Sequence, residues 1–567
     1  MLAPANRQNT IKNAAFAILF AVTGVFLLWK CRYGFGNWDE SFYLTVPYRL
    51  WMGDGLFGQE WHLSQMAGFL LLPFLAVYML FSGGSTAGII LVFRYFYTAV
   101  QAAAALFLYF RLKKFSWVGA AVASLLFFLY APFGIMAMSY NSLGILCLTV
   151  STVLLATNEG QKRWEFALSG LFFAAAVLCC PYLAAVYFLY SLVVLANRLL
   201  KFSRHPLLEG KCWLWLTAGI SLLAAIFLIF VLRRNSIATI LNAFPAMLND
   251  PEHASRSASY LITSYFRSIF GRIDGAKYFY IGLGVLLAAH LMDRKHKIPG
   301  CVHFILGAVL TIFLILPFAT TDRYINSIML PLNFFGLFCC GLTQNKTVRT
   351  LLFAAWIPGM LYSFCIHMAS NQYYLAISSA STVSLVASVV IILITCRELL
   401  TGKVLKGLTV VSLACLLALQ MGGLVSLRYT SVFWESSMEG QTEVMETGPE
   451  KGLLVTPGRK SYYEYLLADT APFREEAKAA SVLYLSENTW LYLASEGIEM
   501  SPYSAWLAGV NDNTVERLVI YYEINPHKLP QIIYAEAQYA EFAYRLAANY
   551  DYSVTSSSYG NLIFTQN

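Results

Sequence analysis

The chain has 567 residues, of which 58% are hydrophobic and 12% are charged. Soluble proteins carry about a quarter charged residues, so this composition excludes a soluble globular protein and indicates that much of the chain lies in a bilayer. The formal net charge is +8, but Lys and Arg gather in short loops between apolar segments. This pattern is typical of membrane-protein orientation and argues against a nucleic-acid partner.

Apolar segments long enough to enter or cross a bilayer recur along the first three-quarters of the chain. They are Ala14–Trp29, Gln65–Phe81, Gly88–Phe110, Trp117–Phe133, Asn141–Thr157, Trp164–Cys180, Tyr182–Ala196, Trp213–Leu232, Tyr278–Met292, Cys301–Thr320, Ile325–Leu342, Val348–Ile366, Tyr373–Cys396 and Leu408–Leu424. No small-residue cleavage site follows the first of them, so we expect a retained span rather than a cleaved signal.

Charge counting predicts which segments cross. If the N-terminus is cytoplasmic and every segment crosses, Arg111, Lys113 and Lys114 lie outside, against the positive-inside rule. The segment Gln65–Phe81 is short, polar at its start and interrupted by glycine and proline, so we expect it to lie in the interface without crossing. Every strongly basic loop then becomes cytoplasmic. The sequence thus predicts about thirteen spans, with the N-terminus inside and the C-terminus outside.

Two domains are expected. Residues 1–427 form an all-α polytopic membrane domain with an extracytoplasmic loop at 30–87, whereas residues 428–567 become polar with alternating apolar patterns. We expect the second part to be an extracytoplasmic α/β domain. Its predicted strands are Lys451–Thr456, Ser481–Leu485, Arg517–Tyr522 and Gln531–Ala535, and its predicted helices are Lys460–Ala468 and Gln538–Asn549.

Two adjacent carboxylates follow the first span. Asp39 and Glu40 lie among the aromatic residues Trp38, Phe42 and Tyr43. A partly desolvated carboxylate at a membrane surface can accept a proton from a hydroxyl nucleophile, which is general-base chemistry. These residues alone are equally compatible with two solvated acids between aromatic membrane anchors.

Other polar residues are expected at the outer surface. Glu60 and His62 precede the interface segment and could point back toward the acid pair. A guanidinium at the lipid boundary can bind phosphate through paired donors, which makes Arg323 a candidate, with pairing to Asp322 as the alternative. Arg94 lies inside the outer end of its span, where an uncompensated charge is costly, so we expect it to have a partner.

In combination, these features resemble the GT-C fold polyprenyl-phosphate-sugar glycosyltransferases, in the branch with protein mannosyltransferases and the lipid A aminoarabinose transferase. The family's Asp-Glu pair and following aromatic are similar to Asp39, Glu40 and Tyr43, and its juxtamembrane helix resembles Gln65–Phe81. Its Arg at the outer end of the next span is similar to Arg94. A C-terminal outer α/β domain also fits that branch.

Later in the chain the resemblance is less complete. The family's Arg-Tyr pair before a Pro-containing span is similar to Arg323, Tyr324 and Pro331. In the second outer loop, where the family often has an Asp, this chain has Asn141 after Tyr140.

The resemblance implies inverting transfer of a sugar from a polyprenyl-phosphate donor to a hydroxyl of a glycan, lipid or protein, on the extracytoplasmic face of the cell membrane. It implies that Asp39 and Glu40 are catalytic, and these carboxylates could also hold a divalent cation such as Mg²⁺ or Mn²⁺. The residues expected to bind the donor phosphate are Arg323, Tyr324, Arg94 and His62, and those expected to bind substrate are Tyr43, Glu60, Gln65, Asn141 and Tyr140.

The alternative from a different class is a lipid-linked sugar flippase or transporter without covalent chemistry. Transporters usually keep ionisable groups near the membrane midplane and often contain internal repeats. The apolar segments of this chain are nearly free of central charges and show no repeat, which favours the transferase.

Overall fold

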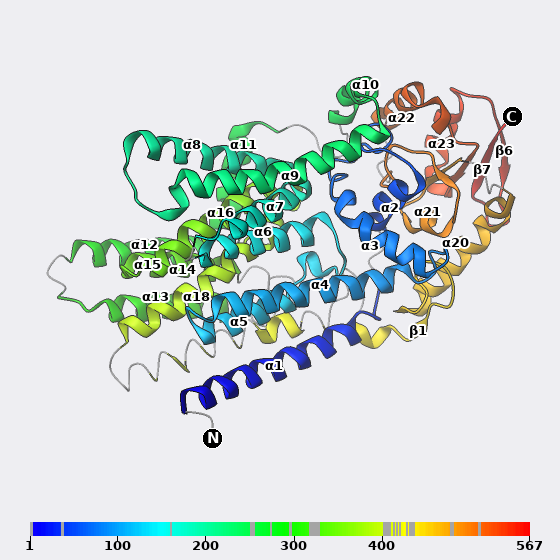
Figure 1. The fold of residues 1–567 in the computed structure, drawn as a ribbon. Helices are drawn as coiled ribbons and strands as arrows, with labels where there is room; N and C mark the ends of the chain where they lie inside the picture. Colours follow the sequence, from blue (N-terminus) through cyan, green and yellow to red (C-terminus); the bar gives the residue numbers. More distant parts are fainter. Residues whose placement is uncertain are drawn as a thin grey trace.

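The computed structural model describes residues 4–35, 39–158, 161–249, 256–272, 275–293, 297–316, 329–400, 437–476, 481–507 and 512–567, together with scattered residues between 407 and 429. The molecule is elongated, and its two termini lie at opposite ends (Figure 1). At one end lie the ends of the bundle helices and the loops that connect them, and the other end carries the mixed α/β region of the C-terminal part.

The described part contains seven helices that are long and apolar enough to cross a membrane, so the chain is a multi-pass membrane protein. They are Thr10–Lys30 of α1 (Pro4–Lys30), α4 (Ile89–Leu112), α6 (Tyr140–Thr157), Pro181–Leu200 (η2, Pro181–Leu183, with α8, Ala184–Leu200), α9 (Gly210–Arg234), Lys346–Ala369 (α15, Lys346–Leu351; η6, Leu352–Trp356; α16, Ile357–Ala369) and α18 (Thr382–Leu399). A bent pair, α11 (Ala258–Gly271) and α12 (Ala276–Met292), makes eight if it is one span.

Shorter helices complete the bundle. The apolar ones are α3 (Ala67–Phe81), α5 (Trp117–Leu129), α10 (Ile237–Leu248), α13 (Gly300–Ile315) and α14 (Met329–Leu342), and α7 (Arg163–Cys179) and α17 (Tyr373–Ala380) lie between longer ones. At ~1.5 Å per residue each apolar one is shorter than the ~30 Å hydrocarbon core. The structure therefore confirms the membrane class, while the figure of about thirteen spans stays a prediction. The predicted segment Leu408–Leu424 lies largely outside the described residues.

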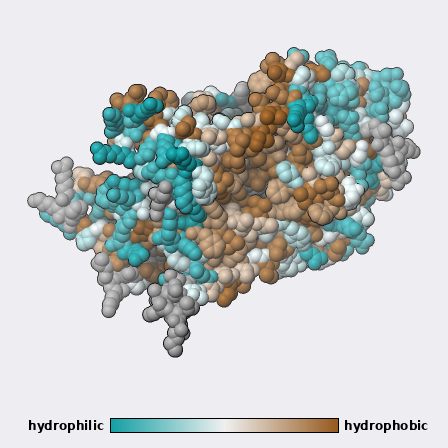
Figure 2. Space-filling view, viewed as in Figure 1, coloured by the Kyte–Doolittle hydropathy of each residue, from teal (hydrophilic) through white to brown (hydrophobic). Residues whose placement is uncertain are grey.

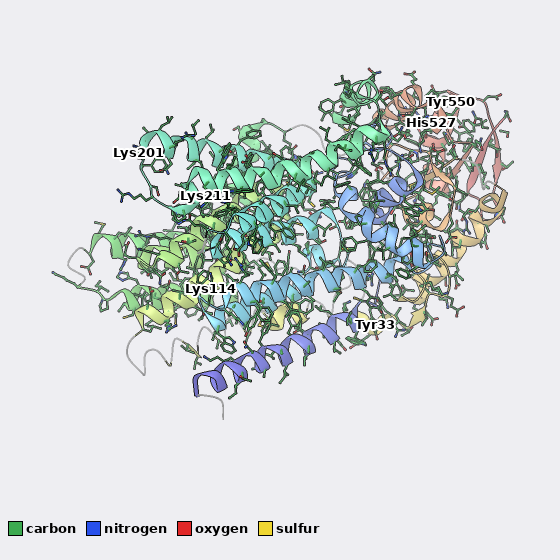
Figure 3. All side chains as sticks on the ribbon, viewed as in Figure 1. Tyr33, Lys114, Lys201, Lys211, His527 and Tyr550 are labelled. Atoms are coloured by element: carbon green, nitrogen blue, oxygen red, sulfur yellow. The ribbon has the colours of Figure 1, made fainter. Side chains whose placement is uncertain are left out.

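The hydropathy of the surface agrees with a membrane protein. Figure 2 shows hydrophobic residues over the middle of the molecule and hydrophilic residues at its two ends. Lys114, Lys201 and Lys211 lie toward one end, and His527 and Tyr550 lie at the other (Figure 3). The described residues of the predicted basic loops and the C-terminal region are thus at opposite ends.

Close helix packing builds the centre of the bundle. α6 and α18 are largely buried, whereas most of α1 is exposed. α7 packs on both α6 and α9, and a Cβ added at Gly170 of α7 or at Gly219 of α9 would overlap the backbone of the facing helix. Small residues that allow two backbones to approach are the usual means of packing helices in a membrane, where lipid is as apolar as the side chains.

Two short helices cap one end of this bundle. α2 (Asp39–Met52) is followed by a loop and then by α3, which packs against α2. A Cβ at Gly68 of α3 would overlap Val46 of α2, so the two helices are in close contact. The length of α3 agrees with the expected short interface segment.

The C-terminal region contains a five-stranded mixed sheet in the order β4 (Glu499–Met500), β3 (Ser481–Leu485), β5 (Ile532–Ala535), β7 (Leu562–Gln566) and β6 (Tyr552–Ser556). β4, β3 and β5 are parallel, and β5, β7 and β6 are antiparallel. A separate antiparallel pair joins β1 (Glu443–Val444) to β2 (Leu454–Val455). The helices of this region are α20 (Pro457–Glu476), α21 (Trp490–Ala494), α22 (Asp512–Ile524) and α23 (Ala540–Ala547).

Most predicted elements of this region are present. β3 and β5 lie where strands were expected, and α20 and α23 overlap the expected helices. The strand predicted at Arg517–Tyr522 is wrong, because these residues belong to α22. Val515, Leu518 and Tyr521 are buried at helical spacing, so packing on the core overrides the strand preference of β-branched and aromatic residues.

The core of the C-terminal region is shared with the membrane part. Trp61 from the loop after α2 and Met247 from α10 are buried together with Leu483, Tyr521 and Ile533. The backbone of residues 32–34 also pairs with Leu454 of β2. The described C-terminal region is therefore joined by packing and hydrogen bonds to the loop after α2, to α10 and to the turn after α1.

Candidate active site at the start of α2

The first turn of α2 carries both predicted catalytic acids. Asp39 is partly exposed and Glu40 is buried. The Glu40 carboxylate forms a two-pronged ion pair with Arg94 of α4, with 2.5 Å from Nε to Oε1 and 2.7 Å from Nη2 to Oε2. The prediction that Arg94 has a partner is therefore confirmed.

The remaining donors of Arg94 bind backbone. Nη1 donates to the carbonyls of Cys31 and Tyr33, and Nη2 donates to that of Gly34. Together with the two bonds to Glu40, these contacts use all five N–H groups of the guanidinium. Arg94, which was expected to bind the donor phosphate, instead fixes Glu40 and the turn that connects α1 to α2.

A polar aromatic cluster lies beside the acids. The Tyr43 and Tyr140 rings meet edge to face at 5.6 Å. Burial raises the pKa of the Tyr43 phenol well above its ordinary value, the negative charge of Asp39 adds to this effect, and a hydrogen bond with Asn141 opposes it. The structure thus brings together two segments that are far apart in the sequence. One carries Asp39, Glu40 and Tyr43, and the other carries Tyr140 and Asn141.

The second half of this cluster is held by the beginning of α6. Ser139 caps the helix by accepting a hydrogen bond from the Ser142 backbone, and the Ser142 hydroxyl bonds back to the Ser139 backbone. This reciprocal arrangement fixes where the helix starts. Tyr140 and Asn141 occupy the first turn, so the cap positions both side chains beside α2.

His62 approaches the site from another direction. Its ring packs on Phe42 of α2 at 4.6 Å between centroids, and its Nδ1 atom interacts with the Ser64 hydroxyl at 2.7 Å. Phe42 in turn contacts Trp506 of the C-terminal region. His62 is half-buried near the acid-bearing helix, which agrees with its expected place at the site but does not identify what it binds.

Glu60 and Gln65, both expected to bind substrate, are used elsewhere. Glu60 is fully buried, and its Oε2 atom accepts a hydrogen bond from Arg49 at 3.0 Å. The Gln65 side chain accepts from the Phe57 backbone and donates to the Met247 sulfur. Both side chains therefore stabilise the loop between α2 and α3 through hydrogen bonds within the protein.

Arg49 is the centre of an ion network that the sequence did not suggest. Its Nε atom donates to Asp54 at 2.8 Å, and its other donors reach Glu60 and the carbonyls of Gln59 and Pro502. Lys528 also contacts Asp54, at 2.5 Å. An Arg close to an apolar stretch requires a partner, which is the signal that could have indicated the network.

Burial and charge pairing have opposite effects on the pKa values of Arg49, Asp54 and Glu60. Burial alone would lower the pKa of Arg49, but Asp54 and Glu60 raise it above its ordinary value. Burial also opposes the charge of Asp54, yet Arg49 and Lys528 hold its pKa below the ordinary value of 3.8. For Glu60 burial prevails, and its pKa is raised despite the contact with Arg49.

The edge of the sheet that touches α2 is also polar. Ser486 directly follows β3 and Glu536 directly follows β5, and the Ser486 hydroxyl donates to Glu536. Asn488 and Tyr462 complete this hydrogen-bonded group. Ligands of parallel sheets bind at the carboxyl ends of strands where the strand order reverses, and β3 and β5 flank such a point.

A direct bond connects this edge to the acid-bearing helix. The hydroxyls of Thr489 and Ser41 are 2.5 Å apart, and α21 packs on α2. Both strands were expected from the sequence, so the polar residues immediately after them were available as a signal. The contact between this polar group and α2 could not be predicted from the sequence, because it depends on the packing of the two domains.

Two predicted phosphate ligands lie outside the described residues. They are Arg323 and Tyr324. For a metal, no group of three or more His, Cys, Asp or Glu side chains suited to an ion occurs in the part of the chain that the structure describes. Glu40 is already neutralised by Arg94, so the pair Asp39 and Glu40 does not fit a dedicated divalent-cation site.

Comparison with known proteins adds no assignment. No protein-family model matches the sequence, and no curated protein matches it.

Proposed function

We propose that this chain is a membrane glycosyltransferase that transfers a sugar from a polyprenyl-phosphate donor to a hydroxyl of a glycan, lipid or protein. The proposal includes about thirteen spans, a cytoplasmic N-terminus and an outer C-terminal domain. The observation that carries it is the cluster at the start of α2. The partly exposed Asp39 lies near Tyr43, which contacts Tyr140 and Asn141, and the adjacent Glu40 is held by Arg94.

The proposed reaction is a single displacement. The acceptor oxygen forms a bond to the anomeric carbon while the bond from that carbon to the phosphate oxygen breaks, and polyprenyl phosphate leaves with the electron pair. Asp39 accepts the hydroxyl proton as attack proceeds, a general-base role that contributes typically 10²–10⁴-fold. Attack opposite the leaving group inverts the anomeric configuration.

The two carboxylates have different roles in this proposal. Glu40 is paired with Arg94 and buried, so it keeps the first turn of α2 in place. Asp39 retains partial exposure and is available to the acceptor. Tyr43 stays a neutral phenol because its pKa is raised, and with Asn141 it can orient hydroxyl groups of a sugar.

The donor phosphate is assigned to residues predicted from the sequence. Arg323 and Tyr324 remain candidates on the sequence, since a guanidinium can stabilise the charge that develops on the leaving phosphate. His62 is a further candidate because it packs on Phe42 of α2. Arg94 is assigned to positioning, since its donors are already used.

Purified protein given a polyprenyl-phosphate-linked radiolabelled sugar tests the proposal. We expect release of polyprenyl phosphate and appearance of label on an added hydroxyl acceptor. Movement of the intact donor between leaflets of a vesicle, without cleavage, would establish the transporter alternative. Neither cleavage nor movement, over donors of several sugars, would contradict both.

A further inference from the structure

A cavity lies at the end of the bundle opposite the C-terminal region. Its volume is about 280 Å³, and it opens where the ends of several helices meet. It is formed by the loop after α4, the end of α6, the loop between α8 and α9, and the start of α15. Lys114 in Figure 3 marks this end of the molecule, next in sequence to Phe115 of the cavity wall.

The lining combines apolar and polar side chains. Phe115, Leu155, Phe166 and Leu207 provide apolar surface. The polar lining groups are the amides of Asn158 and Gln161, the imidazole of His205, the ammonium of Lys346 and the hydroxyls of Thr347 and Thr350. A site of this kind suits an amphiphile whose polar group accepts hydrogen bonds.

The charges around the cavity favour an anionic ligand. Lys346 is exposed and forms no ion pair among the residues that the structure describes. No described Asp or Glu lines the cavity. Glu165 of α7 is paired with Arg111 at 2.6 Å and approached by Lys162 at 3.8 Å, so its charge is already compensated.

His205 adds a second nitrogen donor at the rim. Its Nε2 atom lies 3.4 Å from the Thr350 hydroxyl, and its Nδ1 atom accepts from the Leu207 backbone. Partial burial lowers its pKa, and a bound anion would favour the protonated ring. Basic pockets between membrane helices are known binding sites for anionic headgroups.

We propose that this cavity binds a phosphate monoester or diester, with Lys346 and His205 as its charged contacts and the hydroxyls of Thr347 and Thr350 as further donors. The volume of about 280 Å³ accommodates a phosphate headgroup, and the apolar lining side chains can contact the carbon chain attached to it. The same phosphate chemistry occurs on an anionic phospholipid and on a soluble phosphate ester. The site is independent of the proposed sugar transfer, because it lies at the other end of the molecule.

Full-length protein in detergent allows both sources to be tested. In one arm, micelles contain phosphatidylglycerol or phosphatidylcholine, and native mass spectrometry measures retained lipid. In the other, inorganic phosphate is titrated against thermal unfolding, with potassium chloride at equal ionic strength as reference. The variants are His205→Gln with Lys346→Gln, Lys346→Gln alone, and the matched control Lys211→Gln, an exposed lysine at the same end that does not line the cavity.

We expect phosphatidylglycerol to be retained in preference to phosphatidylcholine, and about tenfold less in the double variant, the loss expected of one or two charge-assisted hydrogen bonds. Lys211→Gln should match the unaltered protein. Protection by inorganic phosphate without lipid preference, lost in the same variant, identifies a soluble ester. If the double variant does not fold, the binding measured for Lys346→Gln alone tests the site in the same way. Equal binding by all variants in both arms overturns the site.

Discussion

Two buried arginines hold the two ends of α2, and they differ in how many carboxylates they bind. Arg49, near the C-terminal end of the helix, binds Asp54 and Glu60, and both carboxylates are consumed by the network. Arg94 of α4 binds the Glu40 carboxylate at the first turn and the backbone carbonyls of the turn before it. The adjacent Asp39 is partly exposed and acts on the nearby Tyr43 phenol through its charge.

This difference separates a structural ion network from a candidate site. The Arg49 network links the loop after α2 to Pro502 and Lys528 of the C-terminal region, so it fastens two parts of the protein together. The Arg94 pair fixes one acid so that its neighbour has a defined position. The comparison therefore assigns stability to the first arginine and positioning of the reacting carboxylate to the second.

The largest effect is expected for Arg49→Met. This change leaves Asp54 and Glu60 buried without their shared cation, so the free energy of unfolding should fall by at least the ~3–5 kcal/mol typical of breaking one buried pair. Thermal unfolding of purified protein in detergent measures the loss, with exposed Arg233→Met as the control. Stability equal to that of the control would show that the network does not fasten the two parts.

A smaller loss is expected for Arg94→Ala. Glu40 would lose its partner, at a cost of about 3 kcal/mol, the lower end of the usual range, because a carboxylate in the first turn of a helix is favoured by the helix dipole. Arg94→Lys keeps the charge but cannot form the five hydrogen bonds, so it should recover part of the stability and little of the transfer activity.

The measurement is thermal unfolding together with release of polyprenyl phosphate. Arg32→Ala, an exposed neighbour of the turn that Arg94 holds, is the matched control. Full activity of Arg94→Lys would contradict the positioning role.

The pH dependence distinguishes the two carboxylates at Arg49. The pKa of Asp54 is lowered, so its contribution to stability is present above pH 3.8, its ordinary pKa, and is lost as the pH falls through the lowered value. Glu60, with a raised pKa, acts in the opposite direction and favours folding as the pH falls.

Chemical unfolding of purified protein between pH 7 and pH 3 checks these signs. Asp54→Asn should remove the loss at the acid end, and Glu60→Gln should remove the opposing trend. An acid limb unchanged in Asp54→Asn would show that other carboxylates cause it.

The smallest effect is expected for Asn141→Ala. Its loss removes one hydrogen bond to Tyr43, so kcat/KM should fall by about tenfold, which corresponds to ~1.4 kcal/mol. Tyr43→Phe should have a similar effect, and the double variant should lose little more, since both changes remove the same bond. Fully additive losses would show that the two side chains act separately.

The sequence predicted local features better than the contacts between distant parts. Hydropathy and charge indicated the membrane class and the need for a partner at Arg94, and alternating patterns located β3 and β5. The helix at 512–524 was missed because the residues Arg517–Tyr522 have strand-like composition, and only packing on the core makes them helical.

The site was predicted in part for the same reason. Asp39, Glu40, Tyr43, Tyr140 and Asn141 meet as expected. The contact of Glu60 with Arg49 was not predicted, because Arg49 is positioned in part by Pro502, more than four hundred residues away. Spacing along the chain carries no information about such a contact.

The most direct measurement of the central claim is the transfer rate of Asp39→Asn in purified protein. This amide keeps the shape of the side chain but cannot accept the acceptor's proton, so the rate should fall by about 10²–10⁴-fold while thermal unfolding stays unchanged. Asp293→Asn, at the opposite end of the bundle, is the control. A transfer rate equal to that of the unaltered protein would contradict the role of Asp39 as the general base.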